Sequence, residues 1–155
     1  MLLASFSTLV STDYKIIDIH DSDREIEYTP SLRLPGRTVL GVDTGHIYIN
    51  CAEDLARILV SMHVWDSAPG KNVYQGWSEP EEAELSCASG TIHVDQWTRG
   101  LADVWHLPVS GDLHVSVRSQ GRDTVRQRVR EVRRQGGSVR EVDGTEGYLI
   151  DAWPL

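Results

Sequence analysis

Short stretches of alternating apolar and polar residues, each closed by turn residues, run through most of this sequence. Successive side chains of a β-strand point to opposite faces, so this alternation predicts strands with one buried face. The pattern predicts strands over residues 5–10, 15–20, 38–42, 46–51, 58–65, 82–88, 91–96, 113–118 and 148–152. Many short strands separated by Gly and Pro predict an all-β, two-sheet antiparallel β-sandwich of about eight or nine strands. The length of 155 residues fits a single β-sandwich domain over residues 1–155.

The same alternation predicts which side chains form the core. In residues 91–95, Ile92 and Val94 point to one face and His93 to the other. By this rule the core faces hold Ile47, Ile49, Ile92, Val94, Leu113, Val115 and Val117. Tryptophan is too large to stay fully exposed, so we expect Trp65, Trp97, Trp105 and Trp153 in the core or at its edge.

One basic segment interrupts an acidic chain. Residues 118–140 contain eight arginines against only Asp123 and Glu131, while the whole chain carries a net charge of −8. Val125, Val129 and Val132 recur at helical spacing, and Gly136-Gly137 follows. We interpret residues 122–137 as an Arg-rich insert at the sandwich edge, either a helix or a loop.

Composition excludes several classes of protein. No apolar run approaches the ~18 residues of a membrane span, and no basic residue precedes the uncharged N-terminal stretch as in a secretory signal. We therefore expect a cytoplasmic protein with no membrane partner. Two cysteines, Cys51 and Cys87, make no disulfide framework; whether they pair stays open, although a reduced state is expected.

Catalytic and metal-binding signatures are weak. The sequence has no Gly-x-Ser-x-Gly motif and no phosphate-binding glycine loop, and neither cysteine lies in a catalytic signature, so we expect no enzyme activity and no cofactor. Histidines occur one per strand at His46, His63, His93 and His114, and Asp18 shares a face with His20. A metal- or small-molecule-binding sandwich that uses these groups is the alternative function, although no His-x-His pair supports it.

The acidic stretch from Trp77 to Glu84 is the candidate partner-binding site. Its functional residues would be Trp77, Glu79, Glu81, Glu82 and Glu84. Carboxylates beside an aromatic anchor suit a basic protein surface, such as that of a nuclease or toxin. The other interpretation is a solvated strand edge with protective charges. The Arg-rich segment could contact phosphates, but the acidic chain makes nucleic acid the less expected partner.

Several motifs between residues 44 and 154 occur in an order that resembles a known group of proteins. The more specific ones are Leu107-Pro108-x-x-Gly111 leading to Gly121-Arg122-Asp123, and Tyr148-Leu149-Ile150 followed by Trp153-Pro154. The order resembles a family of small uncharacterised β-sandwich proteins of GC-rich bacteria, which are distantly similar to nuclease inhibitors of the competence-protein-J type. The resemblance implies a sandwich without catalytic residues that acts as an inhibitor or immunity protein for a nuclease or toxin.

Overall fold

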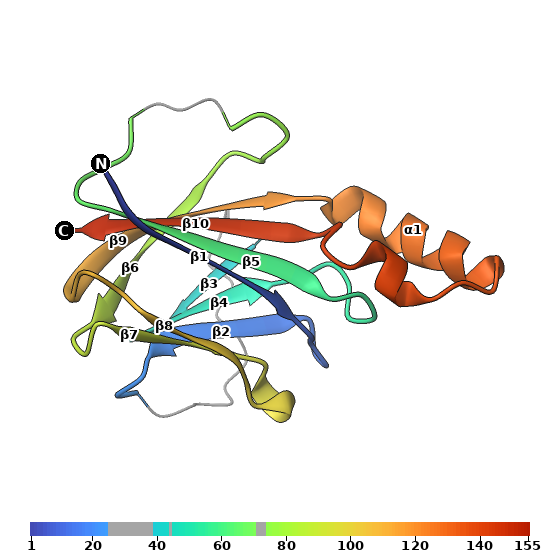
Figure 1. Ribbon diagram of the computed structural model, residues 1–155, viewed down its shortest axis with the longest axis horizontal. Coiled ribbons are helices and arrows are strands. Elements are labelled where there is room, and N and C mark those ends of the chain that lie inside the picture. Colours follow the sequence, from blue (N-terminus) through green and yellow to red (C-terminus); the bar gives the residue numbers. More distant parts are fainter. Residues whose placement is uncertain (25–38, 44, 71–73) are drawn as a thin grey trace.

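Two five-stranded β-sheets pack face to face, and one α-helix lies at one end of the sandwich (Figure 1). The structure is a computed structural model that describes residues 1–24, 39–43, 45–70 and 74–155. The first sheet has the order β1(Leu2–Val10), β5(Ile58–Trp65), β10(Gly147–Pro154), β9(Gly111–Gln120) and β6(Glu81–Cys87). The second sheet has the order β3(Leu40–Asp43), β4(His46–Asn50), β2(Ile16–Asp21), β7(Thr91–Asp95) and β8(Leu101–His106).

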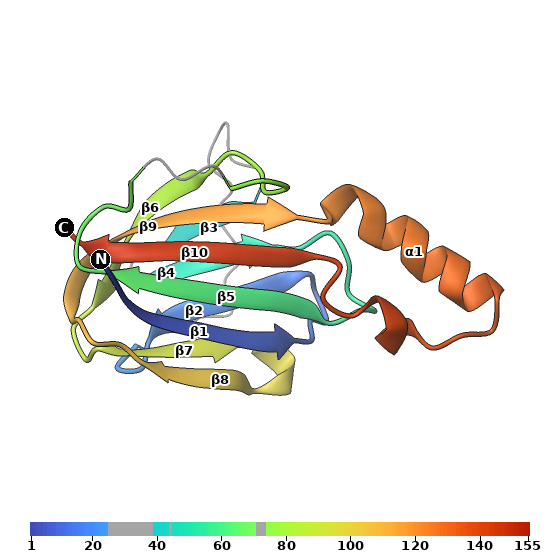
Figure 2. The ribbon, with the colours of Figure 1, turned by 45° about the horizontal axis from the view of Figure 1, so that its top comes forward.

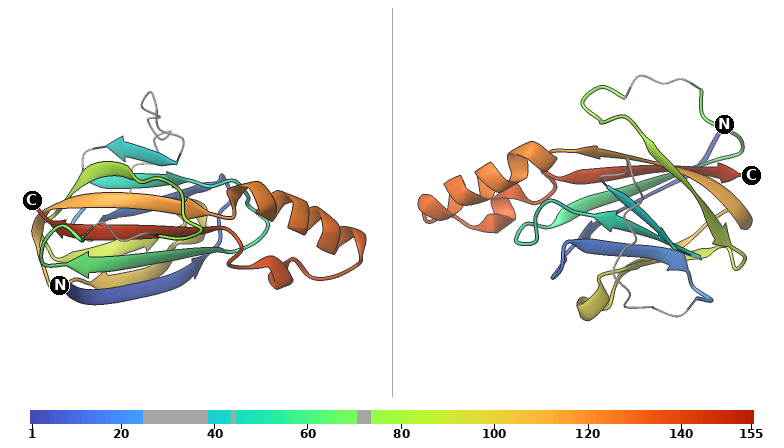
Figure 3. Two further views of the ribbon diagram at one scale, coloured as in Figure 1. Left: turned by 90° about the horizontal axis from the view of Figure 1, so that it is seen from above. Right: turned by 180° about the vertical axis from the view of Figure 1, so that it is seen from behind.

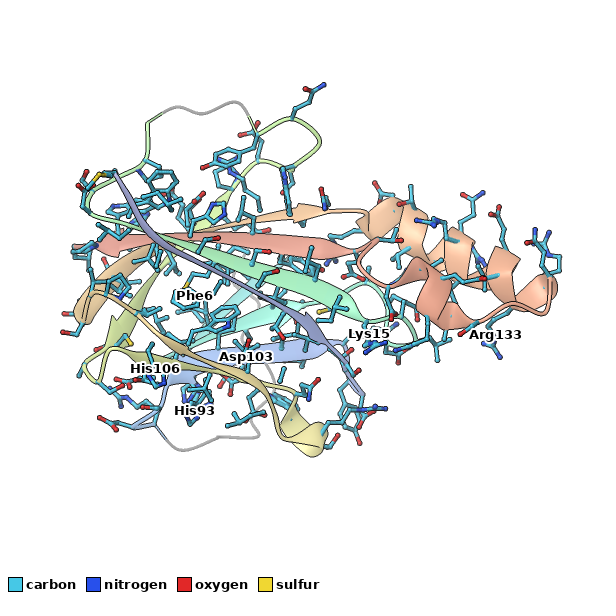
Figure 4. All side chains as sticks on the ribbon, viewed as in Figure 1. Phe6, Lys15, His93, Asp103, His106 and Arg133 are labelled. Carbon is cyan, nitrogen blue, oxygen red and sulfur yellow. The ribbon has the colours of Figure 1, made fainter. Side chains whose placement is uncertain are left out.

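The core fills the space between the inner faces of the two sheets. All seven aliphatic residues that the alternation assigned to the core are buried there. Phe6 of β1, which is labelled in Figure 4, stacks on Trp105 of β8 with ring centroids 5.6 Å apart and so joins the two sheets at one side. Trp105 is the buried tryptophan of the expected four; Trp65, Trp97 and Trp153 are half-buried. Trp153 lies on the outer face, because its neighbour Ala152 faces inward.

Two features differ from the predicted sandwich. The described residues form ten strands, because β8 follows a 3-10 turn, η1(Trp97–Arg99), that the sequence pattern did not separate from a loop. The first sheet is mixed, not antiparallel, because β10 pairs with β5 in parallel and with β9 antiparallel. Alternation reports which face a residue occupies, but it carries no information on the direction of the neighbouring strand. The first residue of the predicted strand 38–42 lies outside the described residues.

The Arg-rich insert forms a helix, α1(Arg122–Arg134), followed by a 3-10 turn, η2(Val139–Val142). Figures 2 and 3 show α1 extending beyond the ends of the strands, away from the sandwich. Its buried residues, Val125 and Val129, form a separate small apolar cluster with Ala52, Ala56 and Val142. Gly121 allows the sharp entry to the helix: its φ is 72°, and a Cβ there would lie 1.8 Å from the Thr145 carbonyl oxygen.

Cys51 and Cys87 are both buried and free. Burial is the main cause that raises the pKa of the Cys87 thiol to about 11. A thiol in this state is a weak nucleophile at neutral pH. No helix among the described residues has the length and apolar character needed to cross a membrane.

Candidate functional site

An acidic groove lies beside the two edge strands β6 and β3. It has a volume of about 780 Å³ and is lined by Val42, Asp43, Gly45, Glu82, Ala83, Glu84, Leu85, Ser86, Asp112 and His114. Four of these residues are acidic, and they come from β3, β6 and β9. The side chain of Arg24 packs over Gly45 at the rim. We call this groove the acidic groove, after its four carboxylates: Asp43, Glu82, Glu84 and Asp112.

The strand alternation of β6 decides which acidic residues reach this groove. Ala83 and Leu85 face the core, so Glu82 and Glu84 project from the outer face, where both are exposed. Glu82 Oε2 lies 3.5 Å from His114 Nε2, and Glu84 is paired in register with His114. The structure therefore brings Glu82 and Glu84 of the predicted site together in one groove.

The other predicted site residues lie elsewhere. Glu81 is half-buried, and its carboxylate accepts hydrogen bonds from the backbone N–H groups of Val39 at 3.1 Å and Leu40 at 3.2 Å. This side chain bridges the two sheets instead of lining the groove.

Trp77 is half-buried in the loop before β6, where its backbone N–H donates to the Tyr74 carbonyl, and Glu79 is exposed beside it. Sequence reasoning missed Asp43 and Asp112, because only strand pairing places them beside β6.

An aromatic pocket adjoins the acidic groove on the outer face of the first sheet. The pocket encloses about 250 Å³, and its lining includes Tyr74, Glu82, Arg118, Asp151 and Trp153. Asp151 is buried at its base and accepts hydrogen bonds from Trp65 Nε1 and the Tyr74 hydroxyl, both at 2.8 Å. Glu82 borders both cavities, so groove and pocket form one continuous surface.

Two stacking contacts hold the walls of this aromatic pocket. The guanidinium carbon of Arg118 lies 4.2 Å from the centre of the Tyr74 ring. Trp153 stacks on His114 with ring centroids 4.4 Å apart, and His114 belongs to the lining of the acidic groove. A half-buried tryptophan in such a position is the residue type that commonly anchors protein interfaces.

Three of the predicted histidines meet on the outer face of the second sheet. The ring of His20 lies 4.9 Å from that of His46 and 5.5 Å from that of His93. Asp18, fully buried, accepts a hydrogen bond from Nδ1 of His46 at 2.9 Å, and burial raises the pKa of this aspartate. His63 and His114 lie on the first sheet instead. Within the described ranges, no three His, Cys, Asp or Glu side chains are grouped so that they could hold a metal ion.

The base of α1 is fixed by a polar junction. Arg122 donates to the Asn50 carbonyl at 2.6 Å and to the Tyr148 hydroxyl at 2.5 Å. Tyr148 in turn donates to the buried carboxylate of Glu146, which also accepts the backbone N–H of Ala52 at 2.8 Å. The helix is thus positioned firmly at its first turn, while most of its arginines remain exposed.

Comparisons with known proteins support the fold and leave the sequence family open. No family model matches the chain, and no curated protein sequence matches it. A crystal structure of ComJ from Bacillus subtilis, described as an inhibitor of the DNA degrading activity of NucA, is similar over 100% of this chain and 98% of ComJ. The TM-score is 0.61 at 11% sequence identity.

A second solved structure, crocagin biosynthetic gene J, is similar over 98% of this chain and 99% of its own, with a TM-score of 0.55 and 14% identity. At these identities the likeness concerns the fold alone. It confirms the predicted similarity to proteins of the competence-protein-J type at the level of architecture. The motif order suggested a family of small β-sandwich proteins from GC-rich bacteria, but no protein-family model matches the chain.

Proposed function

We propose that this protein is a non-catalytic cytoplasmic inhibitor that binds a basic DNA-degrading nuclease through the acidic groove. The observation that carries the proposal is the convergence of four carboxylates from three strands on one groove: Asp43, Glu82, Glu84 and Asp112. A groove lined by four carboxylates is complementary in charge to a basic partner surface. The fold similarity to ComJ supports a nuclease as this partner.

The aromatic pocket supplies the second part of the proposed interface. Charged residues at an interface rim mainly govern the rate of association, whereas a buried aromatic anchor governs dissociation. In this proposal Trp153 replaces Trp77 as the aromatic group at the interface, because it stacks on His114 at the border of the acidic groove. Glu81 supports the groove by joining β6 to the residues at the start of β3.

The proposal is tested by depletion of nuclease activity. Immobilised wild-type protein and the variant Glu82→Lys/Glu84→Lys are each incubated with an extract of the source cells, and DNA degradation is measured in the unbound and eluted fractions. Wild type should retain DNA-degrading activity, and added free protein should inhibit the eluted enzyme. A control with the same change in charge, Asp54→Lys/Glu141→Lys, alters two exposed carboxylates outside the groove and should behave as wild type.

Two results would contradict the proposal. If wild type retains no DNA-degrading activity, or free protein does not inhibit the eluted enzyme, the nuclease-inhibitor function is wrong. If the groove variant retains the activity as well as wild type, the acidic groove is not the interface.

A further inference from the structure

Three arginines lie near the free end of α1. Arg130, Arg133 and Arg134 follow one another at helical neighbour spacing, so they share one face, and all three are exposed. Within the part of the chain that the structure describes, no hydrogen bond or ion pair engages these side chains. We name these three residues the arginine row. Arg133 is labelled in Figure 4, at the far end of the helix from the sandwich.

The remaining arginines of the helix have structural partners. Arg126 donates to the Ala52 carbonyl at 2.8 Å, and Arg128 donates to the Thr145 hydroxyl at 2.6 Å. Glu131, the carboxylate within the arginine row, accepts a hydrogen bond from Gln127 at 3.1 Å. The helix dipole favours basic residues in a last turn, but an interaction of about 0.3–1 kcal/mol does not explain three neighbouring cations. The three exposed guanidinium groups are therefore available to an external anion.

We infer that the arginine row binds the phosphate backbone of double-stranded DNA without reading its sequence. Guanidinium groups bind phosphate oxygens in a bidentate manner. The row spans about 6 Å along the helix axis, and each DNA strand carries a phosphate about every 3.4 Å along its own axis. A rigid helix with this spacing reaches two or three successive phosphates.

The composition of α1 favours duplex DNA over other anions. Its residues include no aromatic side chain, so it has no group on which the bases of a single strand could stack. Its apolar residues are valines on the side that packs on Ala52 and Ala56, so no large apolar side chain is left to enter a lipid surface.

The net charge of −8 does not prevent this contact. The helix has 13 residues and is therefore about 20 Å long. It points away from the sandwich in every view (Figures 1 to 3). Repulsion from the acidic body is screened over about 10 Å at 0.1 M salt. We therefore expect weak binding, with a dissociation constant of order 10⁻⁴ M at about 0.1 M salt.

The test measures the salt dependence of binding to a short fluorescent DNA duplex by anisotropy. If each of the three arginines contacts one phosphate, each doubling of the salt should weaken wild-type binding about sixfold. In Arg133→Gln/Arg134→Gln one contact remains, so each doubling should weaken binding only about twofold. The matched control, Arg24→Gln/Arg99→Gln, removes two exposed arginines elsewhere and should keep the wild-type salt dependence.

Several outcomes would overturn the inference. The first is that wild type fails to bind the duplex at about 0.1 M salt. The second is that the arginine-row variant keeps the wild-type salt dependence while its helical circular dichroism is unchanged. Tighter binding to the single strand of the same length, or to anionic lipid vesicles, would assign the arginine row to a different anion.

Discussion

At the scale of single residues, the buried carboxylate of Glu146 makes the stability of the fold depend on pH. It is 1% exposed, and its two carboxylate oxygens accept the backbone N–H groups of Ala52 and Glu53. Burial raises the pKa of Glu146 above its ordinary value of 4.5, although the bonds from Tyr148 and Ala52 and the nearby charge of Arg122 act in the opposite direction. The folded state therefore holds the Glu146 proton more tightly than the unfolded chain.

This raised pKa predicts a pH-dependent difference in stability. A group with a raised folded-state pKa contributes stability that is fully present below its unfolded pKa and is lost as the pH rises through the folded pKa. The free energy of unfolding of wild type, relative to Glu146→Gln, should therefore be greatest below about pH 4.5 and decrease above it. Urea unfolding from about pH 4 to about pH 8 measures this difference.

An exposed control separates Glu146 from the other titrating groups. Glu79→Gln should follow the wild-type curve throughout this range, since Glu79 is exposed. A constant difference between wild type and Glu146→Gln across the range would show that the Glu146 pKa is not raised in the folded protein.

Residue-level prediction from the sequence succeeded where local alternation decides the result. The inward positions of Ile92 and Val94 follow from their place in one strand. The role of Glu81 could not be predicted in this way, because its hydrogen-bond donors, Val39 and Leu40, lie about forty positions earlier in the chain. Asp112 likewise lines the acidic groove only because β9 pairs with β6.

At the scale of elements, α1 is a unit with its own anchoring contacts. Val129 is 3% exposed and packs in the small cluster beside Ala52 and Ala56, apart from the main core. Val129→Ala removes two methyl groups, which should cost about 1–2 kcal/mol. Amide hydrogens of residues 122–134 should then exchange about tenfold faster, while those of β10 keep their protection.

Arg130→Ala is the control for this experiment, since the side chain is exposed on the same helix and alanine is a good helix former. It should leave exchange in α1 unchanged. Faster exchange in β10 as well as in α1 after Val129→Ala would mean that helix and sandwich unfold as one unit, contrary to this account.

The elements show where sequence patterns stop being informative. The spacing of Val125, Val129 and Val132 indicated a helix, and the structure resolves the choice between helix and loop in its favour. Strand β8 was missed because only Trp105 within it is buried, so its alternation is faint. The parallel pairing of β10 with β5 depends on how the chain returns after α1 and η2, which no local pattern encodes.

At the scale of the whole molecule, opposite charges are separated in space. Acidic side chains from β3, β6 and β9 meet in the acidic groove, whereas the arginine row lies near the free end of α1. The sequence showed the same separation along the chain, but the acidic groove itself forms only when the two edge strands come together. In the proposed function, the acidic groove recognises a basic nuclease by charge.

The most direct test measures, by surface capture, how fast the nuclease associates with this protein. The nuclease used is the one that the immobilised wild-type protein recovers from the cell extract. Glu82→Lys/Glu84→Lys should slow association at least about tenfold at low salt and much less at high salt, because salt screens the steering charges. Its melting temperature should stay close to that of wild type, since both side chains are exposed. An association rate equal to that of wild type at low salt, in a variant that remains folded, would contradict the claim.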